Sequence, residues 1–460
     1  QGGILQSSGF LDLTSLIALS QTAKAHAYDE LSLILYIENE VTLDHQVRTR
    51  EDAIRFLELA CRRFVGWLRD GWCTRDVAHY ATEFGYFVMF SKMLRTATDW
   101  GEVYAILYYA LRTNNTVLRN VAGAKPESLR LILSALPEAR HLQFVSMRDR
   151  YGNTVLDYTA RYGRPESLQF LLSIYPESQH FHAACGEGNT VLYSATCSST
   201  SAESALVLLD SIPESQRLQA VSTRDSQGMT VLHHAASSDK SFETIKMILA
   251  LYPEPERVGA VSRQDTAGMT VLHHSASTGC LESIQLILSI YPESERIAAL
   301  CKPDEKGRTA VHYAADSYNH ASVQFLLTQL PESHRLQVVS MQDRDGDTAL
   351  HLAANSCANL RVILDSLAES ERSPVFVICN VKNETALHYV AMLGYSESLP
   401  AVLELIPESE RLQFMCLQDN EGLTPLHKCI FTNSCDLKIV KALLGWIPAS
   451  QRLQVVSVQD

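Results

Sequence analysis

The sequence predicts an all-α solenoid, in which helical repeats with a short extra third helix are stacked behind a helical N-terminal cap or small domain. Three observations predict it: a short motif recurs at nearly constant spacing, apolar residues follow each motif at helical spacing, and a Pro-Glu segment closes most repeats. A chain of 460 residues is long enough for about three ordinary domains. A repeat array can be much longer than one ordinary domain and still form a single body.

The repeating motif is GxT, and its threonine marks each repeat. Successive markers lie 36 to 40 residues apart. The segments "NTVLRNVAG" and "DVAHYATEFGYF" add two fainter copies, marked by Thr116 and Asp76. We therefore predict an array of about ten repeats over residues 72–460, with the first two degenerate. The eight clear markers are Thr154, Thr190, Thr230, Thr270, Thr309, Thr348, Thr385 and Thr424.

Each repeat is expected to open with a tight turn and a first helix. An aspartate stands three residues before most of the motif glycines, and Asp with Gly favours a tight turn. The marker threonine can cap the helix that follows with its hydroxyl. A second apolar helix comes next, as in "LESIQLILSIY" (281–291). The turn aspartates are Asp149, Asp225, Asp265, Asp304, Asp343 and Asp419.

A third helix is predicted after the second. Proline stands 21 to 24 residues after most markers, where it suits the first position of a helix, and Ala368 replaces it once. Apolar residues follow five, seven and eight positions later, as in Leu336, Val338 and Val339. An arginine four positions after the proline is expected to staple neighbouring repeats through acidic groups or helix carbonyls, the alternative being a row of anion-binding arginines. These arginines are Arg217, Arg257, Arg296, Arg335, Arg372, Arg411 and Arg452.

Two of the motifs, "DGDTALHLAA" and "EGLTPLHKCI", resemble the ankyrin-repeat signature, in which a D-x-x-G turn leads into T-x-L-H-x-A-A. The resemblance covers about residues 72–460. It departs from the family in repeat length, which is about 39 residues here against about 33 in the family. In their length these repeats resemble those of ankyrin effectors that intracellular bacteria secrete into host cells. The resemblance implies a solenoid with a concave surface that binds proteins.

The two ends of the chain differ from the array. Residues 1–125 contain no proline and three of the four tryptophans, and stretches of them are strongly helical in pattern. We expect residues 1–71 to form a helical cap, with a partner-recruiting module as the alternative. Asp460 matches the aspartate that opens a turn, so we expect the native protein to continue past it.

Composition narrows the class of partner and the compartment. The formal net charge of -13 argues against nucleic acid and anionic membrane as partners. No apolar run approaches the roughly 20 residues that a membrane helix needs, and no secretory signal is present. The 11 cysteines lack any CxxC spacing and are read as reduced thiols. This predicts a cytoplasmic, reducing location, or the host cell if the protein is a secreted bacterial effector.

Motifs for catalysis and cofactors are missing from the sequence. It contains no GxxxxGK, HExxH or GxSxG, so we predict no enzyme and no cofactor. The most metal-like cluster is His180, His182 and Cys185, but these residues occupy ordinary repeat positions, and no metal is predicted. A thiol enzyme near the N-terminus is the less favoured alternative. It would have to pair Cys61 or Cys73 with His26, His45 or His79.

Histidines stand three residues after most markers, and by the family resemblance they bond backbone groups and tie neighbouring turns together. We therefore assign them a structural role. They are His233, His273, His312, His351, His388 and His427.

The next position along the first helix is rotated by about 100° from the histidine, away from the side that ties the turns. By the family resemblance, this position is expected to face the concave groove. Its residues are mostly ringed, and exposed rings offer large contact areas. Met229 and Met269 at the turns add adaptable contacts. Packing across adjacent helices is the alternative for this row. The predicted partner-binding residues are Tyr158, Met229, His234, Met269, His274, Tyr313, Leu352 and Tyr389.

These observations predict a protein–protein interaction scaffold that binds a protein or peptide in its groove. The alternative is an effector whose enzymatic or recruiting module lies at 1–71 or beyond 460, with the repeats selecting the target. The partner and the oligomeric state are left open by the sequence.

Overall fold

The computed structural model of the chain describes residues 126, 129–130, 133, 138–146, 148, 152–162, 164–185, 190–196, 201–238, 242–393, 403, 405–431 and 437–456. The chain divides into two compact units, residues 1–183 and 184–460. The expected cap at 1–71 and the markers of the two degenerate repeats lie outside the described residues.

The described part of the first unit consists of short helices. They are η1 (Glu138–Arg140), α9 (His141–Val145), α10 (Val155–Tyr162), α11 (Pro165–Leu172) and η2 (Glu177–Gln179). Helix α12 (His180–Cys185) runs across the boundary into the second unit.

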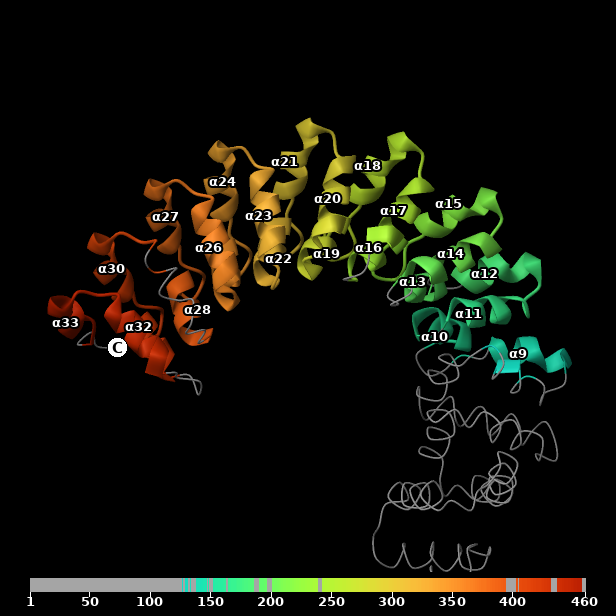
Figure 1. Cartoon of the computed structure of the whole chain (residues 1–460), viewed down its shortest axis with the longest axis horizontal. Helices are drawn as coiled ribbons and strands as arrows, with labels where there is room; N and C mark the ends of the chain where they lie inside the picture. The colour runs from blue at the N-terminus through green and yellow to red at the C-terminus, as the bar shows by residue number, and fades with distance from the viewer. Residues whose placement is uncertain are drawn as a thin grey trace, which may run out of the picture. The chain divides into compact units, whose positions relative to one another are not determined.

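The second unit repeats a three-helix element (Figure 1). The first helices are α13 (Thr190–Thr196), α16 (Val231–Ala236), α19 (Val271–Thr278), α22 (Ala310–Asp316), α25 (Ala349–Leu352) with η3 (Ala353–Asn355), α28 (Ala386–Leu393) and α31 (Pro425–Phe431). The second helices are α14 (Ser201–Ser211), α17 (Phe242–Ala250), α20 (Leu281–Ile290), α23 (His320–Thr328), α26 (Cys357–Asp365) and α32 (Leu437–Gly445). The third are α15 (Glu214–Ser222), α18 (Glu254–Ser262), α21 (Glu293–Cys301), α24 (Glu332–Val339), α27 (Glu369–Phe376), α30 (Glu408–Met415), and η4 (Ala449–Gln451) with α33 (Arg452–Val456).

The helices of the second unit lie side by side in chain order. Its first helices follow one edge of the stack and its third helices the opposite edge (Figure 1). The core lies between first and second helices, where aliphatic side chains such as Leu232, Ile245 and Leu272 are fully buried. The predicted all-α solenoid is confirmed, and each described repeat of the second unit has a third helix.

The third helices differ from expectation in two details. Proline precedes the helix as its extended N-cap residue, as Pro253 does before α18, instead of occupying the first helical position. In most third helices the arginine Nε donates to a carbonyl of its own repeat, five residues back, as Arg257 does to Tyr252 at 3.2 Å, and Arg372 donates to Leu364, eight residues back. Contacts to the following repeat are made by the Nη1 groups of Arg335 and Arg411, which donate to the carbonyls of Ser366 and Trp446.

The turns of neighbouring repeats are hydrogen-bonded in series. The Thr266 N–H donates to the Gln227 carbonyl at 2.8 Å, and the Glu305 N–H to the Ala267 carbonyl at 2.9 Å. Most of the described turns place a glycine at positive φ, such as Gly268 at 77°, and Asn383 takes that place before α28 with φ of 61°. The backbone of one turn therefore fixes the position of the next.

Candidate functional site

Each turn is organised by the two oxygens of its aspartate. In the turn before α19, Asp265 Oδ1 accepts the N–H groups of Ala267 and Met269, both at 2.9 Å. The Gly268 N–H donates to the Asp265 main-chain carbonyl at 3.1 Å. These bonds leave Oδ2 of Asp265 directed at the first helix.

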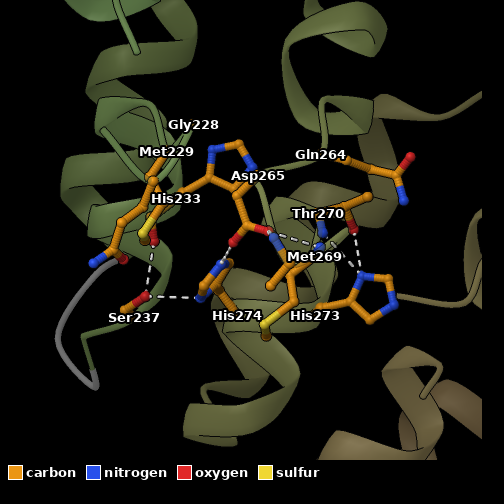
Figure 2. Close-up of polar contacts among 12 residues, drawn as sticks. Gly228, Met229, His233, Ser237, Gln264, Asp265, Met269, Thr270, His273 and His274 are labelled. Atoms are coloured by element: carbon orange, nitrogen blue, oxygen red, sulfur yellow. Dashed lines mark hydrogen bonds and ion pairs between the residues drawn. The ribbon is translucent and has the colours of Figure 1, made fainter. Parts of the chain in front are cut away.

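The second carboxylate oxygen binds the side chain that was expected to face the groove. His274 Nε2 lies 2.9 Å from Asp265 Oδ2, as Figure 2 shows. His234 makes the same contact with Asp225 at 2.8 Å. The Tyr313 hydroxyl donates to Asp304 Oδ2 at 2.6 Å. The polar ends of these rings are therefore held by the turn of their own repeat.

The later repeats use the same contact with different donors. Lys428 Nζ lies 2.7 Å from Asp419 Oδ2 and 2.7 Å from Glu384 Oε1. The Tyr389 hydroxyl, whose own turn carries Asn380, donates to Asp347 of the preceding repeat at 3.2 Å. The residue after the motif histidine thus supplies a donor wherever it is His, Tyr or Lys.

Leu352 shows the converse, because a leucine offers no donor. In its repeat Asp343 Oδ2 instead accepts a hydrogen bond from Arg308 Nε at 2.9 Å, from the preceding repeat. Sequence reasoning missed these acid–donor pairs, although the signal is present: the turn aspartate and the donor stand nine residues apart in the repeats of His234, His274 and Tyr313.

Burial and hydrogen bonding shift the pKa of at least one member in three of these pairs. Burial alone would raise the pKa of Asp265, but the hydrogen bonds from His274 and the Met269 N–H lower it below its usual range. Burial and the hydrogen bond to Asp304 both raise the pKa of Tyr313, which stays protonated as a donor. For Lys428, the two carboxylates outweigh the effect of burial and raise its pKa.

The motif histidines connect one repeat to the next. His273 Nδ1 lies 3.0 Å from the Thr270 N–H, which can only donate, so Nδ1 is unprotonated and Nε2 carries the hydrogen. That Nε2–H donates at 2.9 Å to the carbonyl of Lys302, the C-cap residue of α21 just before the turn of the following repeat. Burial foremost lowers the pKa of His233 and of His273 to about 4, so both rings are neutral.

The other motif histidines make the same contacts. Their Nε2 atoms lie 2.9 to 3.2 Å from carbonyls about thirty residues ahead. The pairs are His233 with Arg263, His312 with Met341, His351 with Glu384 and His388 with Leu423. His427 Nδ1 accepts the N–H of Thr424 at 3.2 Å.

The predicted partner-binding residues differ in how much surface they offer. Tyr158 and Met229 are each only 8 % exposed, so a partner would find little of either. The remaining six, His234, Met269, His274, Tyr313, Leu352 and Tyr389, are half-buried.

The ring residues of this row also pack on their neighbours. The His274 ring meets the His233 ring edge to face at 5.6 Å, and Tyr313 meets His273 in the same way at 5.9 Å. Ser237 adds a hydrogen bond to His274 Nδ1 at 3.0 Å (Figure 2). The row is therefore a packed ladder with a partly exposed outer side.

Large apolar side chains are exposed near the C-terminal ends of several first helices, and sequence reasoning missed them. Tyr318, just after α22, is 78 % exposed, and Phe431 at the end of α31 is 69 % exposed. Leu393 at the end of α28 is 40 % exposed. Leu393 follows Tyr389 by four positions and Phe431 follows Lys428 by three, so each shares a helix face with the ladder.

The residues considered for metal or thiol chemistry have other surroundings. His180 Nε2 lies 3.1 Å from the Tyr175 carbonyl, and burial raises the pKa of the Cys185 thiol to about 12. In the part of the chain that the structure describes, no group of three or more His, Cys, Asp or Glu side chains is placed to hold a metal ion. Cys61, Cys73, His26, His45 and His79 lie outside that part.

Within the same residues, no helix has both the length and the apolar character needed to cross a bilayer. Comparison with protein families matches residues 248–335 and 294–373 to ankyrin repeats (3 copies). No curated protein matches the chain.

Proposed function

We propose that this chain, which contains ankyrin repeats, is a non-enzymatic scaffold that binds a protein or peptide along the first helices of its second unit. The observation that carries the proposal is the set of exposed apolar side chains beside the ladder. Tyr318, Leu393 and Phe431 keep much of their apolar surface exposed to water.

The ladder would define where such a partner sits. His234, His274, Tyr313 and Tyr389 have their polar ends fixed by carboxylates, so their rings lose little side-chain entropy when a partner covers them. A rigid ladder flanked by exposed apolar side chains offers the combination of fixed and adaptable contacts that protein interfaces use. The chain's charge of -13 favours a basic or neutral partner.

The compartment follows from the thiols. Cys280, Cys357 and Cys379 are free thiols, which favours a reducing compartment. If the protein is a bacterial effector, as its long repeats suggest, that compartment is the cytosol of the host cell and the partner is a host protein.

The proposal is tested by capture from a eukaryotic lysate followed by quantitative mass spectrometry. A triple variant, Tyr318→Ser with Leu393→Ser and Phe431→Ser, removes the exposed apolar surface without touching the core. We expect it to lose the proteins that the unchanged chain captures, and the pair Tyr313→Ala with His274→Ala to weaken their capture.

Leu453→Ser is the matched control, because Leu453 is equally apolar and 83 % exposed but lies in α33, among the third helices. It should capture the same proteins as the unchanged chain. If the triple variant captures the same proteins as the unchanged chain, the proposed surface is refuted. If the triple variant and Leu453→Ser lose these proteins equally, the capture is nonspecific hydrophobic adsorption.

A further inference from the structure

The third helices of the second unit repeat one apolar position, and α27 breaks it. Five residues after the proline stand branched aliphatic side chains in the other repeats of this unit, half-buried in all but the last. In α27 the same position is Ser373. The aliphatic residues are Leu218, Val258, Ile297, Leu336, Leu412 and Leu453.

A hollow of about 730 Å³ lies where that side chain is missing, between α27 and α30. Pro374 and Val377 line it from the side of α27, and Phe414 from α30. Val377 is 37 % exposed, so the apolar wall is open to solvent. The hollow therefore has room and apolar surface for a side chain that the protein does not supply itself.

Polar groups that can accept hydrogen bonds line the same hollow. The Ser373 hydroxyl is buried and has no partner among the described residues. Pro374 lies inside the helix and has no N–H to give to the Ser370 carbonyl, one turn earlier. The carboxylates of Glu369 and Glu410 complete the lining. This set calls for a ligand that donates hydrogen bonds and carries positive charge.

The nearby arginines do not fill that role. Arg372 Nε donates to the Leu364 carbonyl and its guanidinium lies near Asp365. Arg411 Nε donates to the Ile406 carbonyl, and its guanidinium lies over the Trp446 ring. Both cations are thus engaged with other groups.

We propose that the hollow between α27 and α30 is a second binding site, which takes one leucine-sized side chain of a basic peptide segment. The aliphatic side chain replaces the one that α27 lacks, and the basic groups beside it meet Glu369 and Glu410. The site lies along the third helices, on the opposite edge of the stack from Tyr318, Leu393 and Phe431. The two proposed binding surfaces can therefore be tested independently.

The test uses the full chain with ¹³C-methyl-labelled valine and three peptides, Ac-Arg-Leu-Arg-NH₂, Ac-Arg-Ser-Arg-NH₂ and Ac-Glu-Leu-Glu-NH₂. We expect the first to shift the Val377 methyl signals saturably at millimolar concentration. The other two should bind about tenfold or more weakly, since one lacks the aliphatic group and the other repels the carboxylates. Ser373→Leu should abolish binding, because the protein's own side chain then occupies the place that the peptide's leucine would take.

Ser373→Ala is the matched control: it keeps the hollow open and should weaken binding less than Ser373→Leu does. Thermal unfolding shows that each variant is folded, and Ser373→Leu should unfold at or above the temperature of the unchanged chain. The proposal is overturned if no peptide shifts Val377, if Ser373→Leu binds as well as the unchanged chain, or if the acidic peptide binds equally. Self-association that Ser373→Leu abolishes would assign the hollow to a second copy instead, and also overturn it.

Discussion

At the scale of single residues, the turn aspartate links the turn to the first helix. One oxygen closes the turn on the backbone, and the other binds the residue that follows the motif histidine, as Asp265 binds His274. The sequence predicted both groups separately. It could not predict that they meet, because the contact depends on where the turn places Oδ2, which a motif does not show. The exchange of donor at Leu352, where Arg308 serves Asp343, shows that the carboxylate itself requires a partner.

Removing a motif histidine should cost substantial stability. His273→Ala leaves the buried Thr270 N–H and the Lys302 carbonyl without their partner. We expect the free energy of unfolding to fall by about 2–4 kcal/mol, from the desolvation cost of the two abandoned groups and the cavity. Urea unfolding followed by circular dichroism measures this. His320→Ala, at an exposed residue of α23, should change it by no more than about 0.5 kcal/mol. Similar losses in the two variants would contradict the structural role.

The same histidines should make the array sensitive to acid. The pKa of His233 and His273 is lowered to about 4, while an unfolded histidine titrates near 6.5. Between these values the unfolded chain binds more protons, so stability is fully present above about pH 6.5 and falls as the pH drops toward 4. Each ring can contribute up to about 1.4 kcal/mol per pH unit in this window.

Melting temperatures measured from pH 7.5 to 4.5 test this dependence. The variant His273→Gln, which cannot be protonated, should show a shallower decline over the same window than the unchanged chain. An unchanged slope would mean that other groups cause the acid sensitivity.

At the scale of elements, the sequence predicted three helices per repeat because each has its own signal: the capping threonine, the apolar second segment and the Pro-Glu start. The starting residue of the third helix was off by one, since proline takes an extended N-cap conformation at Pro253. The hollow at Ser373 was not predicted, because the loss of one aliphatic residue becomes a cavity only when both neighbouring helices are in place.

Two glycines should respond in opposite ways to substitution by alanine. Gly268 has φ of 77°, and a Cβ there would lie 2.7 Å from the Glu305 backbone nitrogen of the next turn. Gly268→Ala should therefore destabilise by about 2–4 kcal/mol, from the left-handed backbone and the forced separation of the turns. Gly259 lies in α18 with open space around its Cβ position, and Gly259→Ala should stabilise by about 0.5–1 kcal/mol. The denaturant midpoints of unfolding of the two variants measure these changes. If Gly268→Ala is stabilising, the turns are not in close contact.

At the scale of the whole molecule, the period of the motif predicted the solenoid, because evenly spaced units of one kind can bury their apolar faces only by stacking. The binding surface could be predicted only in part. The groove row was expected from the family resemblance, but the exposure of Tyr318 and Phe431 depends on the packing around each helix. That packing is not encoded in one repeat's motif.

Neighbouring repeats are coupled through their turns. Neighbouring turns are joined by backbone hydrogen bonds, such as the one from the Glu305 N–H to the Ala267 carbonyl. A destabilised repeat should therefore affect mainly its direct neighbours. In Gly268→Ala, hydrogen exchange should accelerate most at the turns 265–270 and 304–309. It should accelerate less at 225–230 and 343–348, and least at 419–424. Amide exchange read by mass spectrometry of peptides resolves these segments, and Gly259→Ala should accelerate none of them. Equal acceleration from 225 to 424 would show that the array opens as one cooperative unit, in which case the turn-to-turn bonds do not limit the spread of unfolding.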